Sequence, residues 1–311
     1  MTEDCGANIE ALNSGKKIQE FLFHPTERNW ALVASWTSCA EFGSEPCKIY
    51  KELYTTHDLG KSYILLKKYV YDFAWGYTNI IDQKELQHLM PKERIYLTHD
   101  PTASGHQNEG RNVWSNKVNL YYSDNYFKGE VIAVEGGNSL IKTNNFMFVA
   151  KAYQDQEQVL IYISEISSGF TKFNRATVPL EATMSRSFTV MDASESSAFL
   201  HIQNHGNTTP MGNLYISDGS GRFYSLSIEN VLRGVSFVDF EKINSLEGVY
   251  IVNKYDVKHS HNWQAGGSNI DIEKLDVQAQ AVSRMGGTNA GSTSNKQSSS
   301  QNSLTKTGHQ N

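Results

Sequence analysis

Residues 53–63, with the sequence LYTTHDLGKSY, decide the fold class of this chain. A short strand leads into a polar turn and an aromatic residue, in the pattern Ser/Thr-x-Asp-x-Gly-x-Ser/Thr-aromatic that is known as an Asp-box. The residues that match it are Thr56, Asp58, Gly60, Ser62 and Tyr63. In such a turn the carboxylate accepts backbone N–H groups and the glycine supplies a positive φ. We therefore interpret the motif as a structural hairpin and not as a catalytic or metal-binding site.

The strand and turn recur in weaker form along the chain. Segments 120–127, 161–170 and 214–223 each contain Tyr-x-Ser at the end of a strand, followed by a polar turn and an aromatic residue. The Ser/Thr positions of the four copies are Thr56, Ser123, Ser164 and Ser217. They lie about 40 to 70 residues apart, which is about the length of one four-stranded propeller blade. The repeat predicts an all-β fold, a partial β-propeller with about four or five blades.

The composition favours a folded domain and argues against nucleic acid as a partner. Apolar residues make up 39% of the 311 residues, charged residues 20%, and the formal net charge is -5. The 28 basic residues are scattered and form no stripe that could follow a phosphate backbone. We find no apolar run of membrane-spanning length, no secretory signal at the start and no phosphate-binding loop, and we expect no cofactor.

The β pattern covers most of the chain and ends at about residue 257. We divide the chain into an N-terminal flank (1–16), a propeller segment (17–257), a divergent segment with a short helix (258–285) and a polar tail (286–311). Ile272, Leu275, Ala279 and Val282 fall on one face of the predicted helix. The tail contains scarcely any apolar residue, so we expect it to be disordered.

The cysteines allow two interpretations. Cys39 and Cys47 lie eight residues apart, with Gly and Pro between them. They would close a small disulfide loop in an oxidising compartment and would be ordinary thiols in the cytosol. Cys5 has no evident partner. No Cys or His spacing indicates a metal site, and His201 and His205 are predicted on a strand and its following loop, where their spacing does not converge.

The region from about Lys17 to Asn253 resembles the ten-bladed propeller of the sortilin family of sorting receptors. The resemblance rests on the order of several elements. They are 20–30 (EFLFHPTERNW), the Cys39 and Cys47 pair before the Asp-box, 73–76 (FAWG), 188–192 (FTVMD) before 199–202 (FLHI), and 212–218 (GNLYISD) before 221–227 (GRFYSLS) and 248–251 (GVYI). At typical blade lengths, this region covers only part of the family's propeller.

The resemblance implies a receptor and no enzyme. It implies that the chain lies in the Golgi or endosomal lumen and that Cys39 and Cys47 form a disulfide there. It also implies that the sequon at Asn207 is a glycosylation site. Its implied cargo is a vacuolar hydrolase precursor such as that of carboxypeptidase Y. The implied cargo contacts are Ser187, Phe188 and Tyr224. The alternative for these three residues is packing between blades.

Two other functions remain open from the sequence. One is a truncated paralogue of the receptor with no cargo-binding activity. The other is an Asp-box glycosidase of the sialidase type, which needs a cluster of three arginines and a Tyr/Glu nucleophile pair. None of the eight arginines has the Arg-Ile-Pro context that is typical near the start of that enzyme family.

Overall fold

The chain forms a row of antiparallel sheets. The computed structural model describes residues 16–37, 48–79, 84–107, 115, 117–152, 159–179, 188–193, 197–202, 211–234, 237–243 and 248–254. The predicted helix within 258–285 and the tail 286–311 lie outside these residues. Within the described ranges, no helix has the length and hydrophobicity that a membrane crossing requires.

Each sheet is built from strands that follow one another in the sequence and pair antiparallel. The first sheet contains β1 (Ile18–Phe23), β2 (Ala31–Trp36), β3 (Lys51–Thr56) and β4 (Ile64–Lys68), and the second contains β5 (Val70–Trp75), β6 (Ile95–His99), β7 (Asn119–Ser123) and β8 (Val131–Val134). The third contains β9 (Gly137–Lys142), β10 (Phe146–Ala152), β11 (Val159–Glu165) and β12 (Asn174–Arg175), and the fourth contains β13 (Phe188–Asp192), β14 (Phe199–Ile202), β15 (Met211–Ser217) and β16 (Tyr224–Leu232). A two-stranded fifth sheet contains β17 (Phe240–Lys242) and β18 (Tyr250–Val252), and two 3-10 helices, η1 (Lys84–Leu89) and η2 (Ile166–Ser168), lie between strands.

This arrangement confirms the predicted fold class, part of a β-propeller. The described residues form four complete blades and two strands of a fifth, in agreement with the expected four or five. Thr56, Ser123 and Ser217 are the last residues of β3, β7 and β15, and Ser164 lies in β11. The sequence repeat therefore marks the end of the third strand in each complete blade.

A hydrophobic cluster fills each junction between successive sheets. The clusters contain Leu53 and Leu97 at the first junction, Tyr96 and Leu140 at the second, Phe148 and Leu200 at the third, and Phe199 and Phe240 at the fourth. One strand contributes side chains to the junctions on both sides of its sheet, because successive side chains of a strand point to opposite faces. In β10, Met147 belongs to the second junction and its neighbour Phe148 to the third, and both are almost fully buried.

Hydrogen bonds also cross each junction. The indole N–H of Trp75 donates to the carbonyl of Leu22 at 3.0 Å, which joins the second sheet to β1. Tyr96 donates its hydroxyl to the carbonyl of Phe170 at 2.8 Å, which joins the second and third sheets. The third and fourth are joined at a bridge between Thr177 and Phe223, and the fourth and fifth by the Tyr250 hydroxyl, which donates to Asp192 Oδ2 at 2.7 Å.

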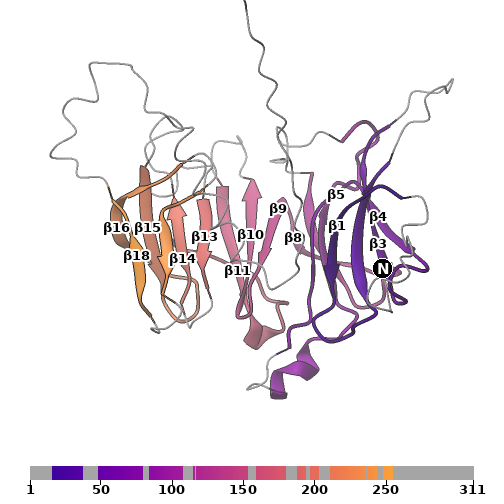
Figure 1. Ribbon diagram of the computed structural model, residues 1–311, viewed down its shortest axis with the longest axis horizontal. Helices are drawn as coiled ribbons and strands as arrows, with labels where there is room; N and C mark the ends of the chain where they lie inside the picture. The colour runs from indigo at the N-terminus through magenta and orange to yellow at the C-terminus, as the bar shows by residue number, and fades with distance from the viewer. Residues whose placement is uncertain are drawn as a thin grey trace, which may run out of the picture.

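The sheets stand side by side in chain order, with the first and last at opposite ends of the molecule (Figure 1). The first strands of neighbouring sheets are close to one another: the backbone N–H of Leu140 in β9 donates to Asp72 Oδ2 in β5 at 2.9 Å. The described blades form an open row, and we call the first strands of the sheets, β1, β5, β9, β13 and β17, the inner strands.

Candidate functional site

The Asp-box turn between β3 and β4 is held by hydrogen bonds among its own residues. The hydroxyl of Thr56 donates to Asp58 Oδ1 and accepts the N–H of Gly60, both at 2.8 Å. Ser62 donates its N–H to Oδ1 of Asp58 at 2.9 Å and its hydroxyl to Oδ2 at 2.6 Å. These bonds from Ser62, with that from Thr56, lower the pKa of Asp58 to about 2. Both oxygens of the carboxylate are engaged by the turn itself, which is the arrangement of a structural group.

The turn in the second blade has the same geometry with a different sequence. The hydroxyl of Ser123 accepts the N–H of Phe127 at 3.0 Å, and Asn125 Oδ1 accepts the N–H of Gly129 at 3.0 Å. Asn125 thus stands where the first blade has Asp58, and Phe127, with a φ of 62°, stands where it has Gly60, with a φ of 90°. An aromatic residue in a left-handed backbone conformation is uncommon, which explains why the sequence motif fades here.

The corresponding turns of the third and fourth blades keep the serine at the strand end but differ from the first turn in the residues that follow it. In the fourth blade, Asp218 Oδ1 accepts the N–H of Arg222 at 3.0 Å and that of Phe223 at 3.2 Å. Burial would raise the pKa of Asp218, but these bonds and those from Ser220 lower it overall. In the third blade the short helix η2 replaces the turn, and the hydroxyl of Ser164 lies 3.1 Å from that of Ser168.

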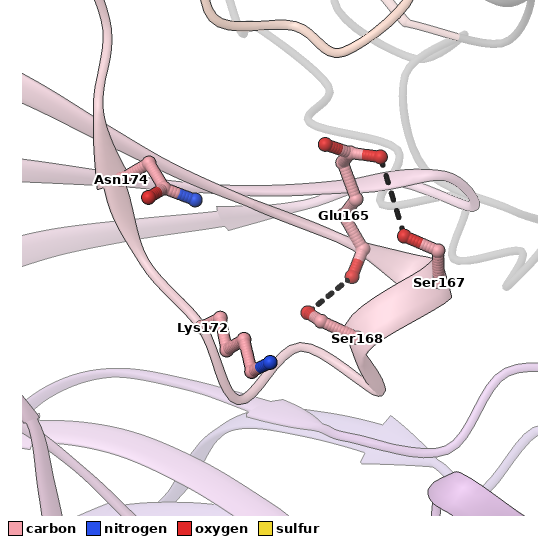
Figure 2. A pocket seen from close by; sticks show the side chains of 5 residues that line it. All are labelled: Glu165, Ser167, Ser168, Lys172 and Asn174. Carbon is pink, nitrogen blue, oxygen red and sulfur yellow. Dashed lines mark hydrogen bonds between the residues drawn. The ribbon is translucent and has the colours of Figure 1, made fainter.

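A small polar pocket lies beside η2 (Figure 2). Its volume is about 290 Å³. Two of its serines are engaged with Glu165: Ser167 donates to Oε2 at 3.2 Å, and Ser168 donates to the backbone carbonyl at 2.8 Å. All of its lining residues are polar, so the pocket offers no apolar wall to a ligand. It is lined by Glu165, Ser167, Ser168, Lys172 and Asn174.

Charged groups beside the inner strands are used to join neighbouring sheets. Burial raises the pKa of Asp72, although the N–H of Leu140 opposes this effect. Lys142 in β9 donates to the carbonyl of Tyr77 at 3.1 Å, and burial lowers its pKa to about 8. Lys51 donates to the carbonyl of Tyr71 at 3.1 Å. These three charged groups form hydrogen bonds within the protein. We therefore take the apolar residues of the inner strands as the candidates for binding a ligand.

Three apolar residues of the first strands form what we call the inner-strand surface. Ile141 in β9 is 38% exposed, and its cross-strand partner Phe148 is buried in the third junction. Phe188 and Val190 in β13 are partly buried against the same cluster. The inner-strand surface therefore lies where the third and fourth sheets meet. Ile141 was not predicted from the sequence, because its only signal was an apolar residue in a strand.

Two of the residues that were predicted to contact cargo, Phe188 and Tyr224, both pack at the third junction. Phe188 is half-buried on the inner-strand surface. Tyr224, at the start of β16, is only 7% exposed and belongs to the third-junction cluster, where burial raises the pKa of its hydroxyl. Tyr224 thus occupies a packing position. Ser187, Asn207 and the pair Cys39 and Cys47 lie outside the described residues.

The described residues show no arrangement typical of catalysis. Among them, no group of three His, Cys, Asp or Glu side chains is placed to hold a metal ion. Arg28, Arg94, Arg175 and Arg222 lie in or beside the first, second, third and fourth sheets, respectively. Arg94, the most engaged of them, donates to Asp124 at 2.7 and 2.8 Å and to the carbonyls of Leu89 and Gly169 at 3.1 Å. Its guanidinium is used within the fold.

Comparison with known proteins identifies relatives for most of the chain. The profile of the Sortilin-Vps10 family, described as "Sortilin, neurotensin receptor 3", matches residues 1–270. A "Vacuolar protein sorting/targeting protein 10" of Aspergillus terreus is 26% identical over 235 residues, which are 74% of this chain and 14% of that protein. The protein of the same name in Laccaria bicolor is 25% identical over 235 residues, which are 74% of this chain and 15% of that protein. The chain thus spans about one seventh of the length of these relatives.

Among solved structures, the β-propeller domain of the Trilobed protease from Pyrococcus furiosus is similar in part. It shares 10% sequence identity with this chain, with a TM-score of 0.42, over 72% of this chain and 60% of that one. A likeness at this level supports no argument about function.

Proposed function

Because the chain belongs to the Sortilin-Vps10 family, whose profile matches residues 1–270, we propose that it is the cargo-binding part of a sorting receptor. The family match is the observation that carries the proposal. Its relatives are named for vacuolar protein sorting and targeting, and this supports a binding protein over an enzyme. The proposed cargo is a soluble vacuolar hydrolase precursor such as that of carboxypeptidase Y, and the proposed compartment is the lumen of the Golgi and endosomes.

We place the cargo contact on the inner-strand surface of Ile141, Phe188 and Val190. Phe188 and Val190 are partly buried, and Ile141 is 38% exposed. An extended peptide that covered them would remove apolar area from water, at roughly 25 cal/mol for each Å². Ser187 precedes Phe188 in the sequence, and its hydroxyl is the proposed donor to the cargo backbone.

Secretion and capture of the full chain test this proposal. The chain, fused to a signal peptide, is purified from the medium and passed over an immobilised carboxypeptidase Y precursor. We expect the wild type to be retained. We expect Phe188→Asp to be retained at least tenfold less, because a carboxylate in a desolvated contact must lose its hydration.

Phe223→Asp is the matched control for Phe188→Asp. Phe223 is 55% exposed in the turn of the fourth blade, away from the inner strands, so this variant should bind like the wild type. A folded, secreted wild-type chain that binds no precursor would contradict the proposal and would favour a paralogue without receptor activity. An equal loss of precursor binding in both variants would show that the inner-strand surface is not the cargo contact.

The same secreted product tests two further proposals. We propose that Cys39 and Cys47 form a disulfide and that Asn207 carries a glycan. Peptide mass analysis should show the two cysteines linked, and endoglycosidase should lower the mass of the wild type but not that of Asn207→Gln.

A further inference from the structure

Connections between the strands of the first two sheets meet at one end of these sheets. The N–H of Leu59 in the Asp-box turn donates to the carbonyl of Asn29, between β1 and β2, at 3.0 Å. The ring of His24 reaches the second sheet, because its Nε2 lies 3.1 Å from the carbonyl of Lys92. These hydrogen bonds hold connections of both sheets against each other. The segments that meet here are 24–30, 57–63, 90–94 and 124–130.

Three aromatic side chains of these segments form a row that we call the ring row, and its members are Trp30, His57 and Tyr126. The ring centroids of Trp30 and His57 lie 4.5 Å apart, and those of His57 and Tyr126 lie 4.9 Å apart. All three side chains are partly exposed. Trp75, almost fully buried at the first junction, lies 6.3 Å from Trp30. The row is therefore supported by the core on one side and keeps surface in contact with solvent.

A carboxylate lies beside the ring row. Burial lowers the pKa of His57, and the negative charges of Asp58 and Glu93 oppose this effect. Burial raises the pKa of the Tyr126 hydroxyl, and the charge of Glu93 adds to the rise. Among the described residues, no basic side chain contributes to either shift. The charge around the row is therefore negative.

Glu93 is the carboxylate at the ring row that can bind a cation. Both carboxylate oxygens of Asp58 accept hydrogen bonds from the Asp-box turn. Between described residues, no ion pair includes Glu93. Its sequence neighbour Lys92 forms an ion pair with Glu27, and Glu93 makes only the smallest of the contributions that raise the pKa of Lys92. Because its lowered pKa leaves His57 uncharged at pH 7, the row presents neutral rings next to an unpaired negative charge.

We propose that the ring row and Glu93 bind the guanidinium group of an arginine on a partner polypeptide. The faces of aromatic rings attract cations, and a carboxylate adds charge complementarity. A guanidinium is planar, so it can stack on a ring while its N–H groups donate to a carboxylate. The ammonium of a lysine is a compact point charge and cannot stack in this way.

An exposed apolar residue next to the row favours a polypeptide over free arginine. The hydroxyl of Thr55 lies 3.4 Å from Nε2 of His57, and Ile64 is the cross-strand partner of Thr55. Ile64 is 51% exposed, so it offers apolar contact to a residue that neighbours the arginine. This site lies on the first two sheets, whereas the inner-strand surface lies on the third and fourth. The inference therefore does not depend on the proposed cargo contact.

Fluorescence anisotropy with labelled peptides and the full secreted chain tests the inference. The probe is fluorescein-labelled Gly-Leu-Arg-Leu-Gly, and the comparison peptide has citrulline, an uncharged analogue of similar shape, in place of arginine. At low salt the wild type should bind the arginine peptide at least fivefold more tightly than the citrulline peptide. Equal binding of the two peptides would overturn the inference, as would equal binding of a lysine peptide or no binding of the arginine peptide at submillimolar concentration.

Glu93→Gln removes the negative charge with little change of shape. We expect it to bind the arginine peptide at least fivefold more weakly than the wild type and the citrulline peptide equally well. Glu135→Gln is the matched control, because Glu135 is exposed between β8 and β9 and its loss changes the net charge by the same amount. If Glu93→Gln binds the arginine peptide like the wild type, or if Glu135→Gln loses as much affinity, the inference is overturned.

Tyr126→Leu tests the contribution of the rings. Tyr126 has a φ of 58°, and Leu59, at the corresponding position of the first turn, has a φ of 61°, so the turn tolerates leucine there. This variant should bind the arginine peptide at least threefold more weakly, because it removes an aromatic face and keeps an apolar side chain. Urea denaturation shows that each variant is folded. Unchanged binding by Tyr126→Leu would overturn the inference, and so would binding of mannotriose without binding of the arginine peptide, since the rings would then form a carbohydrate site.

Discussion

The second junction and the side of the first sheet that faces away from the second sheet are made from the same alternating strands, yet they are buried to different extents. At the second junction, Tyr96 and Met147 have almost no exposed surface. On the far side of the first sheet, Phe21 and Phe23 are each 50% exposed, whereas Val33, the cross-strand partner of Phe21, is 4% exposed. Alternation decides on which side of the sheet an apolar residue lies. Burial depends on what else packs against that side.

The largest expected effect compares two leucines of the first sheet. Leu53 in β3 is fully buried at the first junction, whereas Leu65 in β4 is 42% exposed on the side of the first sheet that faces away from the second sheet. Leu53→Ala should lower the free energy of unfolding by about 2–5 kcal/mol, because it leaves a cavity. Leu65→Ala should cost about 1 kcal/mol or less. Urea denaturation of both variants measures the difference, and equal losses of stability would mean that Leu65 is as deeply buried in solution as Leu53.

A smaller effect is expected from the charged connection across the second junction. Arg94→Met removes the donor to two backbone carbonyls and to Asp124. We expect a loss of about 2–3 kcal/mol in urea denaturation, because buried acceptors lose their partner. Asp124 is 41% exposed and can be solvated, which limits the cost. Arg175→Met, at an exposed position of β12, should change stability by no more than about 0.5 kcal/mol. If Arg175→Met lost as much stability as Arg94→Met, the hydrogen bonds of Arg94 across the second junction would add no stability.

The smallest effect concerns the carboxylate of the first turn, whose hydrogen bonds come from residues of the turn itself. Hydrogen bonds depress the pKa of Asp58 to about 2 in the folded chain, below the value of about 4 for a free carboxyl group. Its contribution to stability is therefore present above about pH 4 and is lost as the pH falls toward 2. Asp58→Asn should lose this pH dependence and keep the turn, as Asn125 does in the second blade.

The reciprocal substitution sharpens the comparison of the two turns. Asn125→Asp places a carboxylate where Gly129 and Ser123 already donate, so stability should gain a dependence on pH of the same sign as that from Asp58. Thermal unfolding between pH 2 and pH 7 measures both variants. If the pH dependence of neither variant differs from that of the wild type, the turn carboxylate makes no contribution to stability.

The sequence predicted the strands and the repeat well, because both follow from local chemistry. Thr56 and Ser123 mark strand ends since a hydroxyl there accepts an N–H from the following turn, whereas the hydroxyl of Ser217 accepts the N–H of Ala198. The sequence predicted less of the candidate site. The resemblance implied Tyr224 as a cargo contact, with packing between blades as the alternative, and Tyr224 lies among the buried residues of the third junction. Ile141 gave no signal, because exposure on an inner strand has no counterpart in the local sequence.

The sequence by itself therefore determined an all-β chain, the order of its blades and the chemistry of its turns. Hydrogen bonds within a turn and alternation along a strand extend over a few residues, so a few residues encode them. Only the tertiary structure decided that Arg94 binds Asp124 and Gly169, that Phe188 is only partly buried and that Phe21 and Phe23 are half-exposed. These features depend on which sheet packs against which, a relation between segments that lie far apart in the chain.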